Sequence, residues 1–319
     1  MANLSTEIKN SVLTSIIKVA RPLHWVKNLA LFAPLIVTGN LFEKPLFYNV
    51  IWAFIAFSFA TSATYIINDI RDVESDKLHP IKRFRPIASG ELTITTASAV
   101  AFLFAISSLY LAASLSQLFF FLVAGYLALQ MAYSFGLKNF AIIDILIIAT
   151  GFIIRVYSGA FVIDAHLSVW FLLCVISVAL FLASGKRRAE LGALGTASGT
   201  RKSLGRYSKA LLNSYVTMFG NAAWLSWALF TFFESPRANL PLWLFLAEIS
   251  RTTTINKLLM ITIPVVIFII MRYESLIFED RSEAPEKLLL TDKALIASVA
   301  LFGGIILWII YGGVSAQGI

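Results

Sequence analysis

The sequence is poor in charged residues, histidine and cysteine. Only 14% of its 319 residues are charged, whereas soluble domains carry roughly 25%. The single cysteine, Cys174, excludes a disulfide within the chain, and its apolar surroundings indicate a packing role. The three histidines, His24, His79 and His166, have no metal-binding spacing. The sequence also lacks a glycine-rich phosphate loop, a nucleophile elbow and an HExxH pattern, so several common enzyme classes are excluded.

The charge deficit is concentrated in long apolar runs. The chain is 58% hydrophobic with a mean hydropathy of +0.80, and charges are nearly absent from several runs of about 20 residues, the length that crosses a bilayer. This pattern predicts an all-α, polytopic membrane protein with one transmembrane domain over residues 1–319. The first span begins near Ser11 and is broken at Arg21–Pro22, because proline interrupts the helical hydrogen-bond ladder. We expect nine spans, at 28–40, 47–68, 94–113, 117–136, 140–162, 167–185, 210–233, 257–273 and 293–312.

Lysine and arginine are distributed unevenly between the two sides of these spans. Most of the 26 fall on one alternate side, which the positive-inside rule assigns to the cytoplasm. We therefore expect a cytoplasmic N-terminus, an external C-terminus and long cytoplasmic loops at 69–92, 186–209 and 274–292. Residues 1–20 lack the pattern of a cleavable signal, so we expect the first span to direct insertion. The apolar segment 241–249 is expected in the outer interface.

The net charge of +8 follows from this distribution of cations. The sequence contains no nucleic-acid-binding motif, so the basic balance does not indicate a nucleic-acid partner.

A group of acidic residues lies at the end of the second predicted span. In NDIRDVESD, Asn68, Asp72 and Asp76 follow one another at intervals of four, with Asp69 beside Asn68. On a helix that continues past the membrane edge these three side chains lie on one face, and Glu74 points away. Three oxygen ligands on one stripe suit Mg²⁺, which takes few protein carboxylates and keeps positions for water and phosphate oxygens.

The same acids are also compatible with a solvated helix end. They would then pair with the neighbouring cations Arg71, Lys77 and Lys82. We favour the metal site because the repeat begins at Asn68, inside the apolar run, where a polar group needs a reason.

A basic loop follows the acidic stripe. HPIKRFRPIASG places Lys82, Arg83 and Arg85 within four residues, and Pro80 and Pro86 favour a shaped loop. These cations suit the oxygens of a metal-bound diphosphate. They are equally compatible with anchors on the cytoplasmic side of the membrane.

The acidic motif resembles that of a known family. Asn68-Asp69-x-x-Asp72-x-x-x-Asp76 after the second span is similar to the first aspartate-rich motif of the UbiA superfamily of intramembrane prenyltransferases. Longer blocks resemble one branch of it, the decaprenyl-phosphate phosphoribosyltransferases, and this resemblance extends over nearly the whole chain. These blocks are RPLHWVKNLALFAP, NDIRDVESDKLHPIKRFRPIASG, YSFGLKNFAIIDILIIATGFIIR, SGKRRAEL and RYESLIFEDRSEAPEKLLLTDKAL.

The resemblance implies a nine-helix bundle with a central cavity open to the cytoplasm, in the inner (plasma) membrane of a bacterium. It implies transfer of 5-phosphoribosyl from phosphoribosyl diphosphate to a polyprenyl phosphate, with release of diphosphate, for cell-wall arabinan precursor synthesis. It also implies dependence on Mg²⁺ bound by Asn68, Asp72 and Asp76, with Lys82 as a further catalytic residue. The oligomeric state stays open, and a homo-oligomer is compatible with the sequence.

One departure from the wider superfamily is informative. Members that use prenyl diphosphates usually carry a second aspartate-rich motif, whereas the region after YSFGLK, which begins at Tyr133, offers only Asp144. We therefore expect no second diphosphate–metal site. This fits a lipid monophosphate as the acceptor and disfavours prenylation of an aromatic ring.

Two anionic substrates can approach each other only if cations offset their repulsion. Lys27 is equally compatible with a lysine that reaches the interface. Lys186 and Arg187 are equally compatible with a stop signal, and if they act on substrate we expect Glu190 to orient one of them. The candidate phosphate-binding residues are Arg21, Lys27, Arg83, Arg85, Lys138, Arg155, Lys186 and Arg187.

Arg155 is a charge within a predicted span, and such charges usually face a polar cavity. Asp144, eleven residues earlier, shares its helix face at a distance of about 16 Å along the axis. We expect these two side chains to line opposite ends of one cavity. Asp144 is equally compatible with a role as partner of the helix dipole.

Two alternatives to the phosphoribosyltransferase remain. One is a prenyltransferase that joins a polyprenyl diphosphate to an aromatic acid, and the missing second carboxylate cluster disfavours it. The other is a transporter, which typically shows internal repeats and midplane charges. The sequence has no convincing repeat, and its acids gather at one membrane face.

Overall fold

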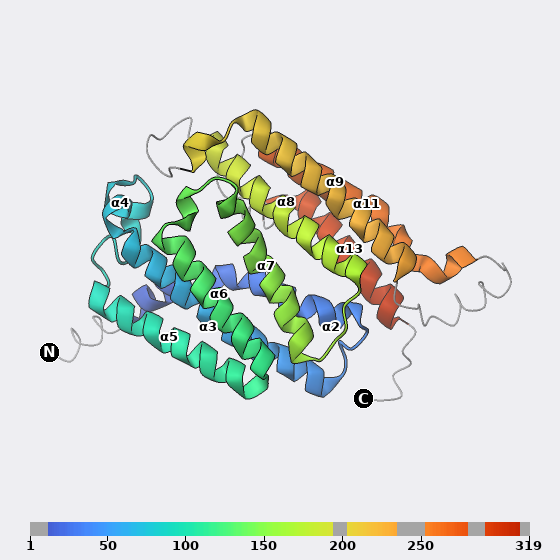
Figure 1. Ribbon diagram of the computed structural model, residues 1–319, viewed down its shortest axis with the longest axis horizontal. Coiled ribbons are helices and arrows are strands. Elements are labelled where there is room, and N and C mark those ends of the chain that lie inside the picture. The colour runs from blue at the N-terminus through green and yellow to red at the C-terminus, as the bar shows by residue number, and fades with distance from the viewer. Residues whose placement is uncertain (1–11, 194–202, 235–252, 280–290, 313–319) are drawn as a thin grey trace. The chain divides into compact units, whose positions relative to one another are not determined.

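The computed structural model describes residues 12–193, 203–234, 253–279 and 291–312, and every regular element in these ranges is a helix (Figure 1). The all-α class is therefore confirmed. The long α-helices are α3 (Lys44–Arg71), α5 (Ile94–Leu115), α6 (Gln117–Phe135), α7 (Ile143–Val162), α8 (Val169–Ala193), α9 (Lys209–Phe233), α11 (Ile263–Phe278) and α13 (Lys293–Tyr311). Residues 12–20 are also helical, and the shorter elements, in which η marks a 3₁₀ helix, are η1 (Pro22–Phe32), α2 (Ala33–Val37), α4 (Val73–Leu78), η2 (Lys82–Phe84), η3 (Leu137–Asn139), η5 (Leu204–Arg206) and η6 (Thr253–Thr262).

Eight helices among the described residues are long and apolar enough to cross a membrane. They correspond to the second to ninth predicted spans, so the predicted count of nine is not confirmed. The first predicted span, 28–40, is instead divided between η1 and the five-residue α2. Pro22 and Pro34 lack the N–H that a continuous helix needs. The predicted break at Arg21–Pro22 is confirmed, because Arg21 has a left-handed backbone with φ of 53°.

The predicted cytoplasmic loops are shorter than expected. Helix α3 continues to Arg71, α8 to Ala193 and α11 to Phe278. Lys, Arg and Glu in these stretches are good helix formers, so charge ends the apolar run without ending the helix. Segment 241–249 and the APEKLLL stretch at 284–290 lie outside the described residues.

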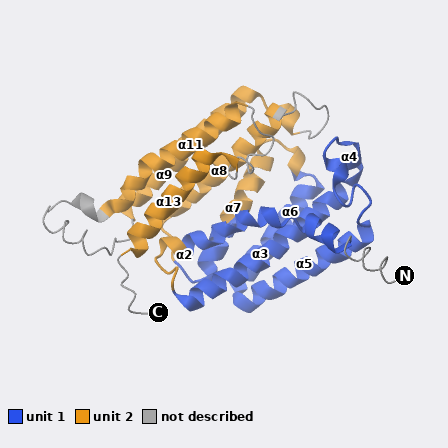
Figure 2. Cartoon of the chain, turned by 180° about the vertical axis from the view of Figure 1, so that it is seen from behind, with its two compact units in different colours: residues 1–35, 43–137, 154–165 blue, residues 36–42, 138–153, 166–319 orange. Residues whose placement is uncertain are grey.

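The chain divides into two compact units, coloured separately in Figure 2. Unit 1 comprises residues 1–35, 43–137 and 154–165. Its central helix, α3, packs against α5, α6 and η1. Alanines on α3 are fully buried and allow neighbouring backbones to approach closely; they are Ala53, Ala56, Ala60 and Ala63.

An apolar cluster beneath the acidic motif fixes the region around α4. It joins the helix at 12–20, α3, α4, the loop that follows and α5. Val73 before the basic loop, Ile87 within it and Leu92 after it are buried in this cluster. The loop is therefore held in a defined shape, in line with the prediction from its prolines. The buried members are Val19, Ile66, Val73, Ile87, Leu92, Ala97 and Ala101.

Unit 2 comprises residues 36–42, 138–153 and 166–319. In it α8 and α9 pack along each other, and α11 contacts both of them as well as α13. One apolar cluster centres on Tyr273 and Ile277 of α11, and another on Ile145 and Ala149 of α7. Residues 143–153 of α7 belong to this unit, and residues 154–162 belong to unit 1.

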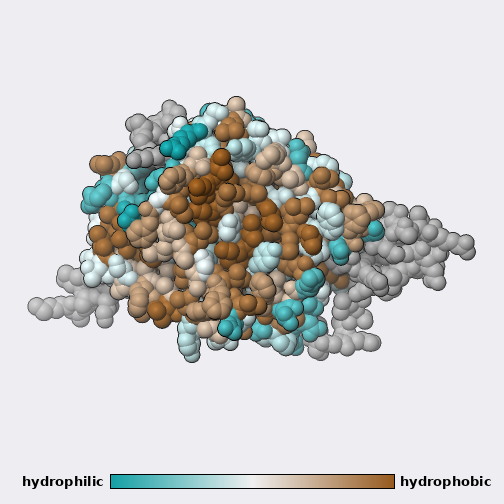
Figure 3. All heavy atoms as spheres, in the orientation of Figure 1, coloured by the Kyte–Doolittle hydropathy of each residue, from teal (hydrophilic) through white to brown (hydrophobic). Residues whose placement is uncertain are grey.

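Large apolar side chains are exposed along the spanning helices. Much of the face seen in Figure 3 is hydrophobic, and Phe102, Tyr110 and Phe121 on α5 and α6 each expose more than half of their surface. Patches of this extent are not tolerated in water but match hydrocarbon. Together with the eight spans they identify a multi-pass membrane protein.

Candidate active site

The acidic motif lies at the point where α3 ends and α4 begins. Asp72 is the residue between the two helices, with φ of −92° and ψ of 5°. The backbone hydrogen bonds nevertheless keep helical spacing, from Asp72 N to Asn68 O at 2.9 Å and from Asp76 N to Asp72 O at 2.8 Å. The predicted continuation of the helix past the apolar run is therefore nearly regular, with one bend.

Asn68 and Asp72 form a direct contact. The Nδ2 atom of Asn68 donates to Oδ2 of Asp72 at 3.0 Å, and the hydroxyl of Ser134 on α6 donates to Oδ1 of Asn68 at 3.4 Å. Both Asn68 and Asp72 are half-buried. Two of the three predicted metal ligands thus lie side by side.

Asp69 is almost completely buried, at 3% exposure, and two arginines hold it. Nη2 of Arg21 lies 2.7 Å from both oxygens of Asp69, and Nη1 of Arg85 lies 3.0 Å from Oδ1. The guanidinium of Arg21 also lies 5.1 Å from the ring centroid of Tyr65. Buried carboxylates require such pairing, since an isolated charge there is very costly.

Asp76 is buried to the same degree as Asp69, and it shares Arg85 with it. Nη1 of Arg85 lies 2.6 Å from Oδ2 of Asp76. One guanidinium nitrogen thus bridges two carboxylates from positions seven residues apart. The acidic group is therefore divided into an Asn68–Asp72 pair and an Asp69–Arg85–Asp76 bridge.

The remaining cations of the basic loop differ in exposure. Arg83 is exposed, with its guanidinium 4.8 Å from the ring of Phe84, and Lys82 is half-buried in η2. Glu74 points outward, as predicted, and pairs with Lys77 at 2.9 Å. This surface pair is the part of the motif that behaves as a solvated helix end.

The donor chemistry of this group fits Mg²⁺ in part. The oxygens of Asn68, Asp72 and Asp76 are of the kind that Mg²⁺ binds, and the hydrogen bond from Asn68 Nδ2 to Asp72 places these two side chains next to each other. The carboxylate of Asp76 is held by Arg85. In the described part of the chain, no three acidic, histidine or cysteine side chains converge as a complete ligand set.

Arg155 on α7 lies in a second polar group within unit 1. It is 5% exposed; its Nε donates to Oδ1 of Asn28 at 2.7 Å and its Nη2 to the hydroxyl of Tyr126 at 3.1 Å. The guanidinium also lies about 5 Å from the rings of Phe57 and Tyr126. Asn28 in turn donates to the hydroxyl of Ser58 on α3 at 3.1 Å.

Asp144 lies in a third polar group, in unit 2. Its Oδ2 is 2.7 Å from Nε of Arg187 on α8, and its Oδ1 accepts from the hydroxyl of Tyr207 at 2.7 Å and from the backbone N–H of Ile145 at 2.9 Å. Asp144 therefore caps the start of α7, as the helix-dipole alternative predicts, and also anchors Arg187. Asp144 and Arg155 are held by different partners, and that they line opposite ends of one cavity stays a prediction.

Arg187 is fully buried and contacts carboxylates on two sides. Besides Asp144 it forms an ion pair with Glu190, and that Glu190 orients Arg187 for a substrate stays a prediction. An arginine enclosed in this way can reach a substrate only after one of these pairs opens. The neighbouring Lys186 is half-buried.

The other predicted cations and Tyr133 lie at intermediate depth. Lys27 in η1, Tyr133 near the end of α6 and Lys138 in η3 are all half-buried. Each is thus partly accessible, as a side chain that contacts a substrate must be.

Three residues that contact the predicted site residues Arg155 and Asp144 were not identified from the sequence: Asn28, Tyr126 and Tyr207. Asn28 is a polar residue in an apolar run, so the argument used for Asn68 would have found it. Tyr126 and Tyr207 carried no signal, because a tyrosine is common both in spans and in loops. Tyr207 lies between α8 and α9, and burial raises the pKa of its phenol well above the ordinary value.

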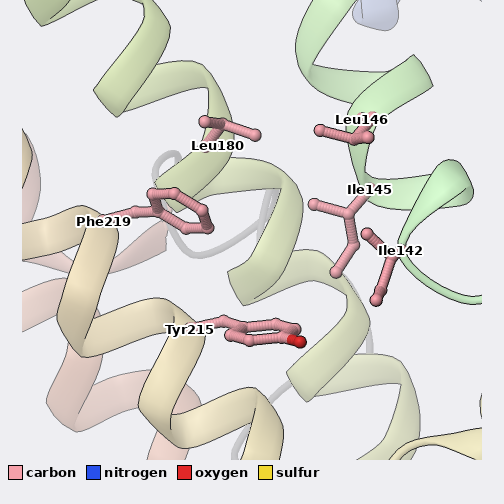
Figure 4. A pocket seen from close by; sticks show the side chains of 6 residues that line it. All are labelled: Ile142, Ile145, Leu146, Leu180, Tyr215 and Phe219. Atoms are coloured by element: carbon pink, nitrogen blue, oxygen red, sulfur yellow. The ribbon is translucent and has the colours of Figure 1, made fainter.

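A small apolar pocket of about 70 Å³ lies in unit 2. Figure 4 shows its six lining residues, from α7 and the residue before it, α8 and α9: Ile142, Ile145, Leu146, Leu180, Tyr215 and Phe219. Ligand pockets measure roughly 300–1,000 Å³ and contain convergent polar groups. This pocket is therefore too small and too apolar to hold a phosphorylated sugar.

Solved structures with a similar arrangement of helices share the UbiA fold. A UbiA homolog from Archaeoglobus fulgidus bound to DMAPP and Mg²⁺ matches with a TM-score of 0.67 and 16% identity, over 93% of this chain and 99% of that chain. The same homolog bound to GPP and Mg²⁺ matches with a TM-score of 0.66 over 94% and 98%. At this identity the likeness shows the fold alone, an all-helical intramembrane bundle.

The sequence assigns the chain within this fold. The model of the UbiA prenyltransferase family matches residues 29–251, and the chain belongs to this family. It is 41% identical over 234 residues to a protein named decaprenyl-phosphate phosphoribosyltransferase in Mycolicibacterium smegmatis, which covers 72% of this chain and 73% of that protein. A protein of the same name in Corynebacterium glutamicum is 36% identical over 284 residues, 88% of this chain and 81% of its own length.

Proposed function

We propose that this chain is a membrane glycosyltransferase that moves 5-phosphoribosyl from phosphoribosyl diphosphate to a polyprenyl phosphate of the decaprenyl type. The observation that carries the proposal is the 36–41% identity with relatives named for this reaction. The acidic and basic groups around α4 support it, because a diphosphate with its metal requires both carboxylates and cations.

The reaction breaks the bond between C1 of the ribose and the diphosphate and forms a bond from C1 to an oxygen of the lipid phosphate. Positive charge develops on the sugar as the diphosphate departs, so the site must stabilise the leaving group. Mg²⁺ would supply that stabilisation by neutralising phosphate oxygens. Asn68, Asp72 and Asp76 are the residues that would hold it.

The basic loop binds and orients the leaving group in this proposal. Lys82 and Arg83 lie in η2, directly after the acidic motif, and Arg85 already contacts that motif. Arginine presents paired N–H groups that match phosphate oxygens, and lysine acts as a compact point charge. These side chains thus oppose the negative charge that accumulates on the departing diphosphate.

The acceptor is anionic at neutral pH, so no strong general base is required. The cations must instead offset the repulsion between the lipid phosphate and the donor. We assign this role to Lys27, Lys138, Arg155 and Lys186. The orientation of Arg155 is fixed by Asn28 and Tyr126.

The location in the cell forms part of the proposal. We place the chain in the inner membrane of a bacterium, with its N-terminus and the α4 region facing the cytoplasm, where soluble phosphoribosyl diphosphate is available. The phosphoribosyl lipid then serves as a precursor of cell-wall arabinan. The alternative, prenylation of an aromatic acid, is not favoured by the relatives' names or by the single acid at Asp144.

The test is a transfer assay with purified full-length protein. Labelled phosphoribosyl diphosphate, a polyprenyl phosphate and Mg²⁺ should give a labelled lipid, and removal of Mg²⁺ by a chelator should abolish it. Formation of product only from a prenyl diphosphate and an aromatic acid would overturn the proposal.

Variants assign the acidic residues. Asp72→Asn and Asp76→Asn should each lower turnover by about 100-fold or more, because each removes charge from a group that stabilises the transition state. Glu74→Gln is the matched control: its side chain is exposed and pairs with Lys77, so turnover should stay within about twofold. Equal losses in all three variants would contradict the assignment.

A further inference from the structure

The carboxylate of Asp76 combines deep burial with a single partner. It is 3% exposed, and within the described residues its side chain pairs with Arg85 at 2.6 Å. A buried carboxylate needs a cation beside it. Either Arg85 or a metal ion would meet this need, and both would draw on the same carboxylate charge.

Asp69 differs from Asp76 because it has a second cation. Nη2 of Arg21 contacts both of its oxygens at 2.7 Å, and Arg85 adds one contact at 3.0 Å. Departure of Arg85 would therefore leave Asp69 neutralised and Asp76 without its cation. The bridge is therefore asymmetric. Neutralisation of Asp76, one of the predicted metal ligands, depends on Arg85, whereas neutralisation of Asp69 does not.

Arg85 is also free to move without disturbing the backbone. Its backbone N–H donates to Lys82 O at 3.0 Å, its carbonyl accepts from Ser89 N at 2.8 Å, and the next residue, Pro86, is buried. Its side chain is 26% exposed, so the guanidinium has an open side. A change of rotamer is sufficient to turn it away from Asp76, and such changes are fast.

We propose that Arg85 competes with the divalent metal for Asp76 and, once released from it, binds the phosphate oxygens of the donor. This inference rests on the proposed function, and it assigns to Arg85 two successive partners within one reaction. In the absence of metal, Arg85 keeps the Asp76 carboxylate neutralised. When the metal takes that place, the guanidinium becomes available at the moment when a diphosphate needs a cation. Arg85 thereby couples binding of the metal to binding of the donor.

The proposal predicts opposite changes in two binding constants. Mn²⁺ serves as the probe, and its binding to purified full-length protein in detergent is followed by the loss of the free-ion paramagnetic signal, without donor or lipid. Arg85→Gln should bind Mn²⁺ about tenfold more tightly than the wild type, because a charge-assisted hydrogen bond of roughly 1.4 kcal/mol or more no longer competes. With Mn²⁺ present, the same variant should bind phosphoribosyl diphosphate at least about tenfold more weakly.

Lys77→Gln is the matched control. Lys77 is adjacent to Asp76 in sequence, but its side chain is exposed and pairs with Glu74. Lys77→Gln removes the same unit of charge from α4, the helix that carries Asp76, so any general electrostatic effect on Mn²⁺ appears in both variants. Arg85→Lys provides a milder change: lysine can pair with Asp76 but lacks the planar fork, and Mn²⁺ affinity should fall between the other two.

Two results would overturn the proposal. The first is Mn²⁺ binding by Arg85→Gln that is no tighter than binding by Lys77→Gln. The second is a loss of both metal and donor affinity in Arg85→Gln, which is the result expected if Arg85 only supports the fold. Should that variant fail to fold, Arg85→Lys carries the same test.

The outcome is separate from that of the transfer assay. A wild-type protein that makes the phosphoribosyl lipid, with no gain of Mn²⁺ affinity in Arg85→Gln, would refute the competition alone. A wild-type protein that makes no lipid product would refute the proposed function, whatever the Mn²⁺ results.

Discussion

Arg21 and Ile142 have left-handed backbones although neither is glycine, with φ of 53° and 70°. Such conformations cost of order 1–3 kcal/mol each, and most for a β-branched residue such as Ile142. Both lie at polar contacts: the side chain of Arg21 binds Asp69, and the backbone N–H of Ile142 donates to the hydroxyl of Tyr207. The polar groups around α4 and α7 therefore offset a local cost in the backbone.

Tyr207 offers a test of this stabilisation. Its hydroxyl accepts from Ile142 N and donates to Asp144, so Tyr207→Phe leaves the buried carboxylate of Asp144 and the backbone N–H of Ile142 each short of a partner. We expect a loss of about 1–3 kcal/mol in the free energy of unfolding, measured by denaturant titration in detergent. Tyr215→Phe is the control, since Tyr215 lines the apolar pocket and its change should be nearly neutral.

The same variant predicts a pH dependence. Burial raises the pKa of Tyr207 above its unfolded value of about 10. Its stabilisation is therefore complete below about pH 10 and is lost as the pH rises through the folded pKa. The difference in stability between the wild type and Tyr207→Phe should be constant near neutrality and shrink above about pH 10. A constant difference across that range would contradict the assigned contacts.

Helices α7 and η1 approach each other so closely in unit 1 that only glycine fits at one point. A Cβ atom built on Gly159 would overlap the backbone carbonyl of Leu31. Gly159→Ala should therefore destabilise the protein by about 1–3 kcal/mol or more, because the backbone must shift to relieve the overlap. Thermal unfolding in detergent would show it as a lowered midpoint.

Gly125→Ala on α6 is the matched control. Nothing lies within 4 Å of a Cβ at that position, and alanine favours helix over glycine by up to about 1 kcal/mol. The control should be neutral or slightly stabilising. A neutral Gly159→Ala would show that η1 and α7 can separate without cost.

The positions of α3 to α13 were largely predictable, because about 20 apolar residues without charges leave few alternatives to a spanning helix. The start of the chain was not. Pro22 indicated a break, but the sequence does not show that the segment after it forms η1. That depends on partners distant in the chain: Trp25 donates to Ser62 at 3.0 Å and Asn28 to Ser58.

The acidic residues of the candidate site could be predicted from the sequence, but the ion pairs that they form could not. The interval of four places Asn68, Asp72 and Asp76 on one helix face, and this spacing persists. The ion pairs that divide the acids arise from Arg21, 48 residues before Asp69, and from the turn of the basic loop that returns Arg85 to Asp76. Helical periodicity contains no information about such contacts, which tertiary packing decides.

At the scale of the whole molecule, the thickness of the membrane can be compared with the length of α3, the helix that carries the acidic motif. Helix α3 has 28 residues and is therefore about 42 Å long, whereas the hydrocarbon core is about 30 Å thick. Charged residues lie at both ends of α3, with Glu43 and Lys44 before its apolar run and Asp69 and Arg71 after it. In the proposed function, the end that carries the acidic motif is the one that meets the soluble phosphorylated donor.

We predict that this end of α3, with the acidic motif and the basic loop, lies on the cytoplasmic side of the membrane. The chain has one cysteine, Cys174, which is buried, so Cys174→Ser provides a background for single-cysteine labelling. Ser75, in α4, and Glu43, before α3, lie beyond opposite ends of α3, and both residues are exposed. Each is replaced by cysteine in this background.

With the basic loop in the cytoplasm, a membrane-impermeant thiol reagent added outside intact cells should label Glu43→Cys and not Ser75→Cys. Inverted vesicles should reverse the result. The background variant controls for unspecific labelling. Labelling of Ser75→Cys from outside would place the metal and phosphate residues away from the cytoplasmic donor, and the orientation and the proposed reaction would then both have to be abandoned.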